Sequence, residues 1–177
     1  MKRKSLLALA LVTLVPLALL ADADDVFVAR FNSAIGVDPI AGVTSATPPA
    51  LVMNVVRGVA PGGALWHIGK FEARVRTNGR IRVEGRHLVL AAGNNLGRSL
   101  GLSVQAQLFC GAGSTTPLTT TTTTLNENGD FRFDENLPSV PPDPCVDPVL
   151  LIAIPPSTAG GASHWIAAGI PQLDLDD

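Results

Sequence analysis

A serine of this chain lies in a pentapeptide that matches the nucleophile motif of one hydrolase class. Gly97, Ser99 and Gly101 form a G-x-S-x-G pattern, aspartates follow it, and His164 comes last, which is the serine, acid, histidine order of α/β-hydrolases. In that class the motif lies on a turn from a strand to a helix, whereas here a strand-like sequence, GLSVQAQLF, follows. We interpret the pentapeptide as a turn between strands, and a hydrolase that uses Ser99 and His164 stays an alternative.

Three histidines, the number that many catalytic zinc sites use, occur at His67, His87 and His164. No two of them have the H-x-H or H-x-x-x-H spacing of a metal site. His67 and His164 each adjoin a tryptophan, as expected for histidines that pack at the edge of a core. We expect no metal and no other cofactor, and a metal-binding protein that uses His67 and His164 is the second alternative.

Several acidic residues in the last third of the chain could offer oxygen ligands to calcium. They are Glu127, Asp130, Asp134, Glu135, Asp143 and Asp147. The segment 126–130 lacks the spacing of a calcium loop, and acids on the solvent face of a hairpin need no ion. The sequence therefore predicts no calcium site.

The threonine tract 119–124 could carry O-linked glycans or present a flat row of hydroxyl groups. A single row without repeats is too short for the second role. Since threonine is common in strands, a threonine-rich strand is the simpler interpretation.

Basic residues form the most unusual pattern in the chain. Six of them fall between residues 70 and 86, namely Lys70, Arg74, Arg76, Arg80, Arg82 and Arg86. Arginines that face one another across a hairpin oppose its stability, and such choices suggest a function. The face of Arg74, Arg76, Arg80 and Arg82 is a candidate contact for an anion or an acidic surface, and a solvated face neutralised by Glu72 and Glu84 is the alternative.

These arginines alternate with apolar residues on both sides of the segment 77–79, which is the period of a half-buried hairpin. A two-residue turn would place Val75 opposite Arg82, on a face that must be buried. A three-residue turn with Gly79 in the left-handed conformation pairs Val75 with Ile81 instead, and we expect this register. The same device at 127–129 would pair Leu125 with Phe131.

Further strands are expected near residues 51–56, 88–92, 101–110, 149–154 and 164–168, with little helix between them. The chain is therefore predicted to be all-β, a Greek-key β-sandwich of immunoglobulin-like architecture, with a small β-barrel as the alternative. We expect three segments. Residues 1–23 form a signal peptide that contains a signal helix, residues 24–63 form a partly irregular segment of strands and turns, and residues 64–177 form the core domain.

The first residues have the order of a secretory signal: Lys2, Arg3 and Lys4, an apolar run over 6–20, and an A-x-A site that ends at Ala23. The run is too short for a membrane span and contains a proline, so no transmembrane anchor is expected after cleavage. The mature chain would have ten basic and fourteen acidic residues, a formal net charge of −4. This mild acidity argues against a nucleic-acid partner.

Export also explains the cysteines. Cys110 and Cys145 are the two cysteines of the chain, and an even number in an oxidising compartment predicts one disulfide. It would fix the loop 138–148 to the end of the strand 101–110.

Several segments together resemble small secreted bacterial all-β proteins that have no assigned activity. They are Trp66-His67-Ile68, the T-N-G-R hairpin, SVQAQLFC, the N-G-D-F hairpin, P-C-x-D-P-V-L-L and Trp165-Ile166-Ala167, within residues 60–170. The resemblance implies export and an all-β fold, and it transfers no site residue. We expect a secreted or periplasmic, non-enzymatic binding or envelope-associated module, whose partner is an anionic envelope or extracellular component.

Cleavage after Ala23 gives the first prediction. Protein recovered from the periplasm or the medium should begin at Asp24, as measured by amino-terminal sequencing. Soluble protein that keeps Met1 would contradict export.

Overall fold

The computed structural model describes residues 26–172, which contain strands and loops and no helix. The all-β prediction is therefore confirmed for this part of the chain, and the expected signal peptide and signal helix lie outside it. The strands are β1 (Phe27–Gly36), β2 (Ile40–Val43), β3 (Leu51–Met53), β4 (Ala60–Pro61), β5 (Trp66–His67), β6 (Lys70–Arg76), β7 (Arg80–Arg86), β8 (Val89–Leu90), β9 (Ser103–Phe109), β10 (Leu118–Thr119), β11 (Thr123–Thr124), β12 (Phe131–Asn136), β13 (Val149–Ile154) and β14 (His164–Pro171).

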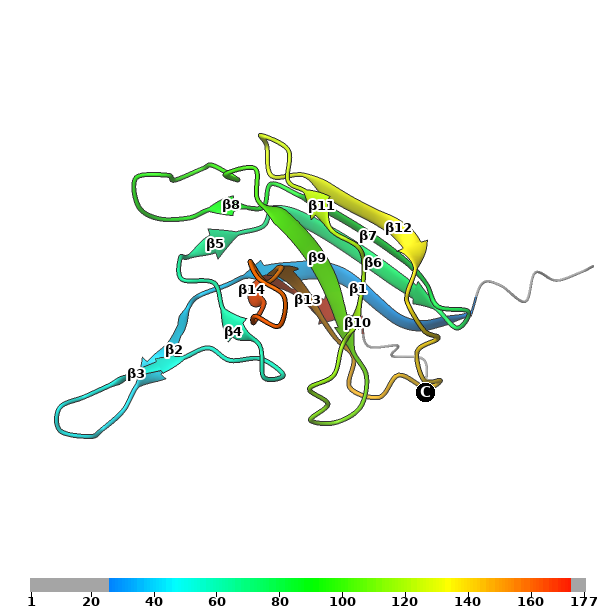
Figure 1. Cartoon of the computed structure of the whole chain (residues 1–177), viewed down its shortest axis with the longest axis horizontal. Helices are drawn as coiled ribbons and strands as arrows, with labels where there is room; N and C mark the ends of the chain where they lie inside the picture. Colours follow the sequence, from blue (N-terminus) through cyan, green and yellow to red (C-terminus); the bar gives the residue numbers. More distant parts are fainter. Residues whose placement is uncertain (1–25, 173–177) are drawn as a thin grey trace, which may run out of the picture.

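Most strands belong to one antiparallel sheet in the order β10-β9-β13-β14-β1-β6-β7-β12. β11 also pairs with β9, and β4 runs parallel to β14. The sheet curls on itself, so that β11, at the β9 end of the order, lies beside β12 at the other end (Figure 1). The curled sheet encloses the core, which contains fully buried side chains from most of its strands, such as Phe31, Ile81, Leu108, Ile152 and Ile166.

A side chain joins the two ends of the sheet. The carboxylate of Glu135 in β12 accepts hydrogen bonds from Thr121 N at 2.6 Å and from Thr121 Oγ1 at 2.7 Å. Beside it, Thr120 Oγ1 accepts a hydrogen bond from Ala106 N of β9 at 2.9 Å, where a paired strand would use a backbone carbonyl. The threonine tract is thus an interrupted edge strand that contacts both ends of the sheet.

The first hairpin has the predicted register. Val75 pairs with Ile81, Ala73 with Val83, and Arg74 with Arg82. Gly79 adopts a φ of 87°, and its N–H donates to Arg76 O at 3.0 Å. The apolar side chains of β6 and β7 point into the core and the charged ones to solvent.

The second predicted hairpin is wrong. Segment 126–130 does form a turn in which Gly129 has a φ of 79°, but β11 pairs with β9 and β12 pairs with β7. The reason is tertiary: Gly129 packs on the backbone of Leu88 and accepts its N–H at 3.0 Å, so the turn is held against the end of β7. The strands on either side of the turn then diverge toward different partners.

β1, from the segment expected to precede the core, lies at the centre of the sheet between β14 and β6. The chain that follows β3 packs against β14. Trp165 Nε1 donates to Asn54 O at 2.9 Å, and Gly62 N donates to Trp165 O at 2.8 Å. Residues 104–109 of β9 and 150–153 of β13, in neighbouring strands of the sheet, are buried on both faces.

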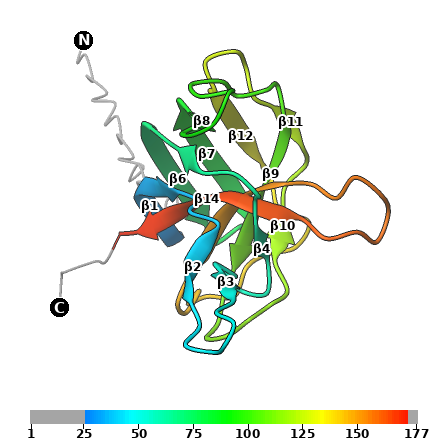
Figure 2. The same cartoon turned by 90° about the vertical axis from the view of Figure 1, so that its left-hand side faces the viewer.

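β2 and β3 form a separate two-stranded ribbon that extends away from the curled sheet (Figures 1 and 2). Its large apolar side chains are exposed, with Val43 at 63% and Leu51 at 62%. No charged residue occurs between Asp38 and Arg57 in the sequence. In Figure 2 the connection from β13 to β14 also extends away from the sheet.

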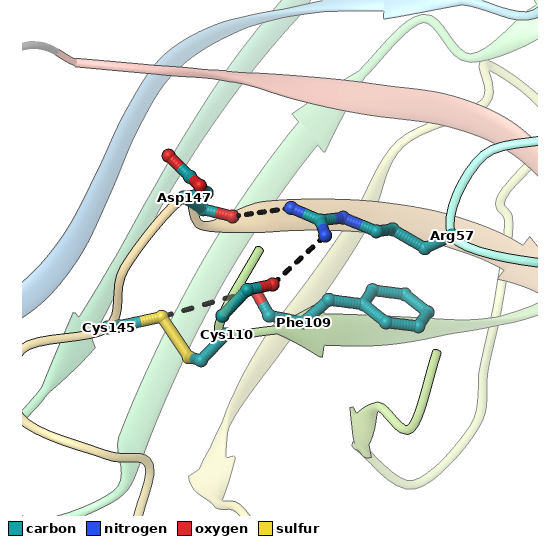
Figure 3. The surroundings of a disulfide bond; sticks show 6 residues. Arg57, Phe109, Cys110, Cys145 and Asp147 are labelled. Atoms are coloured by element: carbon teal, nitrogen blue, oxygen red, sulfur yellow. Dashed lines mark hydrogen bonds between the residues drawn. A yellow bond between two sulfur atoms is a disulfide. The ribbon is translucent and has the colours of Figure 1, made fainter. Parts of the chain in front are cut away.

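The predicted disulfide is present between Cys110 and Cys145, with a Cα–Cα distance of 4.9 Å and a sequence separation of 35 residues. Arg57 lies beside it, and its guanidinium donates to Gly111 O and to Asp147 O, both at 2.9 Å (Figure 3). The end of β9, the loop before β13 and the chain after β3 therefore meet at this point.

Replacing both cysteines by serine should destabilise the protein by about 3–4 kcal/mol, because a cross-link across a loop of this length lowers the entropy of the unfolded chain. Urea unfolding of Cys110→Ser/Cys145→Ser measures the loss. The unreduced wild type should release no reactive thiol on unfolding, and two thiols per chain would contradict the bond.

Gly85 tests the packing inside the curled sheet. A Cβ atom at this position would lie 2.2 Å from two ring atoms of Phe131, which faces it across β7 and β12. Gly85→Ala should therefore cost about 1–3 kcal/mol through overpacking, measured as a lower urea midpoint. Gly63→Ala is the matched control, since nothing lies within 4 Å of the added atom, and an equal loss in both variants would refute the packing argument.

Candidate anion-binding face

The exposed side of β1, β6, β7 and β12 carries many more cations than carboxylates. We call this surface the basic face. Its charged residues are the cations Arg30, Lys70, Arg74, Arg76, Arg80, Arg82, Arg86 and Arg132 and the carboxylates Glu72, Glu84 and Asp134. Eight cations against three carboxylates give the face a formal excess of five positive charges, although the whole chain has a formal charge of −2.

The register arranges these side chains in rows across the strands. Arg30 pairs with Arg74, Arg74 with Arg82, and Arg82 with Asp134, so three guanidinium groups and one carboxylate come from four adjacent strands. Neighbouring strands are about 4.8 Å apart, which is close enough for one ligand to contact several members of a row. The like-charge pair Arg74–Arg82, expected from the sequence, is present.

Ion pairs along and between the strands offset this repulsion. Arg74 Nη2 lies 2.5 Å from Glu72 Oε1, and Arg82 Nη2 lies 2.7 Å from Glu84 Oε1. Arg80 Nη2 lies 2.6 Å from Asp134 Oδ1. The sequence suggested the two glutamates as partners, whereas Asp134 is distant in sequence and reaches Arg80 because β12 pairs with β7.

Contacts of this kind shift the pKa values of Arg82, Glu84 and Asp134 in favour of their charged forms. Glu84 has a pKa below its ordinary value, mainly because Arg82 donates a hydrogen bond to it, and the pKa of Arg82 is raised for the same reason. Hydrogen bonds from Arg132 and Arg80 lower the pKa of Asp134. Glu84 and Asp134 therefore stay ionised to a lower pH than carboxyl groups without such partners.

Phe27 is an aromatic member of the face that sequence analysis missed. The Arg30 guanidinium carbon lies 4.3 Å from the centre of its ring, and that of Arg76 lies 5.8 Å away. The register shifts between Phe27 and Ala29, so Phe27 shares the exposed side with the arginines while Val28 packs toward the core. Simple alternation from Ala29 and Phe31 would have placed Phe27 inside, and no local signal marks the shift.

The four arginines proposed from the sequence line one hollow in the surface, which we call the arginine hollow. A concavity of about 250 Å³ is lined by Phe27, Arg74, Arg76, Arg80, Arg82 and Asp134. All four candidate residues of the sequence analysis thus border a single concave surface, together with an aromatic ring and a carboxylate. Guanidinium groups with fixed planar forks suit phosphate, sulfate and carboxylate groups.

The Ser99 side chain is buried and bonded to backbone groups. Its hydroxyl donates to Asn126 O at 2.6 Å and accepts a hydrogen bond from Gly101 N at 3.4 Å. An open depression beside it is lined by residues 98–101 and 125–127, which include no histidine. His164 is the exposed first residue of β14, and no hydrogen bond joins it to Ser99 in the described part of the chain.

The histidines are arranged differently from the pair that the sequence suggested. His67 lies against His87, with ring centres 6.1 Å apart in an edge-on arrangement, while His164 begins another strand. Within residues 26–172, no group of three or more His, Cys, Asp or Glu side chains is placed to hold a metal ion.

Three of the six acidic residues considered for calcium make structural contacts through their carboxylates. Asp130 Oδ1 accepts a hydrogen bond from His87 N at 3.1 Å, and Asp130 Oδ2 accepts one from Asn126 Nδ2 at 3.3 Å. Glu135 binds Thr121, and Asp134 binds arginines. These carboxylates therefore stabilise the turn 126–130, the join between the sheet ends and the basic face.

Comparisons with known proteins add no identity, because no protein family, curated protein or solved structure matches this chain. In the described residues, no helix is long and apolar enough to span a bilayer.

Proposed function

We propose that the mature chain is an exported, non-enzymatic binding module that holds an anionic ligand at the arginine hollow. The observation that carries the proposal is that Arg74, Arg76, Arg80 and Arg82 border one concave surface with Phe27. The ligand belongs to an anionic envelope or extracellular component, and the curled sheet, a sandwich or small barrel in architecture, is the scaffold.

The ion pairs of the face do not block such a ligand. The arginine side chains of Arg74, Arg80 and Arg82 are about half exposed, and exposed ion pairs contribute little to stability because water and salt screen them. An anion with several oxygens gives each guanidinium a charge-assisted, two-pronged hydrogen bond in exchange. Displacing the glutamates from the arginines therefore costs little free energy.

Rigidity also supports binding. The arginines lie on paired strands, and Phe27 lies under the guanidinium groups of Arg30 and Arg76, so part of the ordering cost is met before the ligand arrives. Strands hold a constellation of side chains more firmly than loops do.

Export is part of the proposal. The disulfide between Cys110 and Cys145 is consistent with an extracytoplasmic location, since such bonds persist in oxidising compartments. The basic residues, apolar run and A-x-A site at the start of the chain support the same location.

The quadruple variant Arg74→Gln/Arg76→Gln/Arg80→Gln/Arg82→Gln tests the site. Its binding of tripolyphosphate and of trigalacturonate should weaken by at least about tenfold and lose most of its salt dependence, because the charges that attract the anion are gone. Titration calorimetry at two salt concentrations measures both effects. The two anions separate a preference for phosphate from one for carboxylate.

Two controls accompany this variant. Arg98→Gln removes a cation outside the basic face and should bind as the wild type does. The quadruple variant should unfold near the wild-type urea midpoint, because its apolar inner face is unchanged. Unchanged binding in a folded quadruple variant, or failure of the wild type to bind either anion, would refute the proposed function.

A further inference from the structure

The charged residues of the basic face form rows across its strands, and the rows differ in charge. Nearest the turn 77–79 lie Arg76 and Arg80, and next comes the row of Arg30, Arg74 and Arg82. The third row contains Glu72 and Glu84 with Arg132 at its β12 end, and the fourth contains Lys70 paired with Arg86. Two carboxylates thus separate the arginine hollow from the basic pair at the other end.

The surface hollows follow the same division. The arginine hollow of about 250 Å³ has Asp134 as its one carboxylate. The adjoining hollow of about 190 Å³ is lined by Glu72 and Glu84 with Arg74 and Arg82, and a larger one of about 460 Å³ is lined by both glutamates with Lys70 and Arg86. A ligand that extends from the arginine hollow along β6 and β7 passes over both glutamates before it reaches Lys70 and Arg86.

Distance makes this passage unfavourable. Residues two apart on a strand are about 7 Å apart, which is shorter than the screening length of roughly 8 Å at physiological salt. On β6 and β7, an anionic group over the third row is therefore repelled by Glu72 and Glu84, and physiological salt screens this repulsion only in part. Extension across the strands, along Arg30, Arg74 and Arg82, meets cations instead.

We infer that the site takes a compact polyanion, with two or three phosphate or carboxylate groups, bound across the strands, and that Glu72 and Glu84 reject extended polyanions. This inference rests on the proposed function and specifies the ligand class. The two glutamates have two effects: each pairs with an arginine of the hollow, and together they end the site on the side of Lys70 and Arg86.

The test compares short and long anions of the same chemistry, namely tripolyphosphate with long-chain polyphosphate, and trigalacturonate with polygalacturonate. The readout is the slope of log Kd against log salt concentration, which rises with the number of charge contacts that a polyanion makes. In the wild type the slope should be the same for the short and long members of a pair. In Glu72→Gln/Glu84→Gln the slope should become steeper for the long member, because Lys70 and Arg86 come within its reach.

A second pair of substitutions, at Lys70 and Arg86, completes a double-mutant cycle with the two glutamates. Lys70→Gln/Arg86→Gln should leave the wild-type slopes for all four anions unchanged, and it should abolish the steeper slope when added to Glu72→Gln/Glu84→Gln. Glu127→Gln, which removes an exposed acid from the turn 126–130, should leave the slopes unchanged. Glu72→Gln/Glu84→Gln, alone or combined with Lys70→Gln/Arg86→Gln, should bind the short anions at least as tightly as the wild type does. In both variants the arginines of the hollow lose the glutamates that compete with the ligand.

The outcomes separate the two proposals. A wild-type slope that already increases with ligand length, or a glutamate variant whose slopes for short and long anions stay equal, overturns the compact-ligand inference while the anion site stands. Failure of the short anions to bind the wild type overturns the proposed function and this inference with it.

Discussion

The turn Thr77–Gly79 fixes which side of the sheet each residue of two central strands faces. Its three residues pair Val75 with Ile81, and this requires Gly79 to adopt a positive φ that other residues avoid. A turn shorter by one residue would exchange the buried and exposed sides of one strand relative to the other. Because β6 pairs with β1 and β7 with β12, the turn also aligns the apolar residues of four strands in the core and gathers the charges on one outer surface.

Within the hairpin of β6 and β7, that surface combines repulsion across the strands with attraction along them. Across the strands, like charges face each other in Arg74–Arg82, Glu72–Glu84 and Lys70–Arg86. Along the strands, Glu72 lies between Lys70 and Arg74 and Glu84 lies between Arg82 and Arg86, and the pairs Arg74–Glu72 and Arg82–Glu84 form there. The arrangement keeps the hairpin folded while its guanidinium groups stay exposed to solvent, and a face designed for stability alone would alternate charges in both directions.

Local patterns in the sequence predict the first hairpin, the disulfide and the four arginines, because each depends on neighbouring residues or on a count. The second hairpin fails because threonine suits both buried and exposed positions, so the tract 119–124 has no parity that fixes a partner. Phe27 and Asp134 join the site through a shift of register in β1 and the pairing of β12 with β7. Both are long-range features, as is the Glu135–Thr121 contact between the sheet ends, and no pattern within a window of sequence contains them.

The ribbon of β2 and β3 has a consequence for how the molecule opens. A two-stranded ribbon is marginally stable in water by itself, and this one shares no ladder hydrogen bond with the main sheet. Its strands therefore separate in local fluctuations that leave the core intact. Its amide hydrogens exchange with solvent far faster than those of β9 and β13, and a protease that nicks the 44–50 loop leaves the remaining fold joined through β1 on one side and the Arg57 and Asn54 contacts on the other.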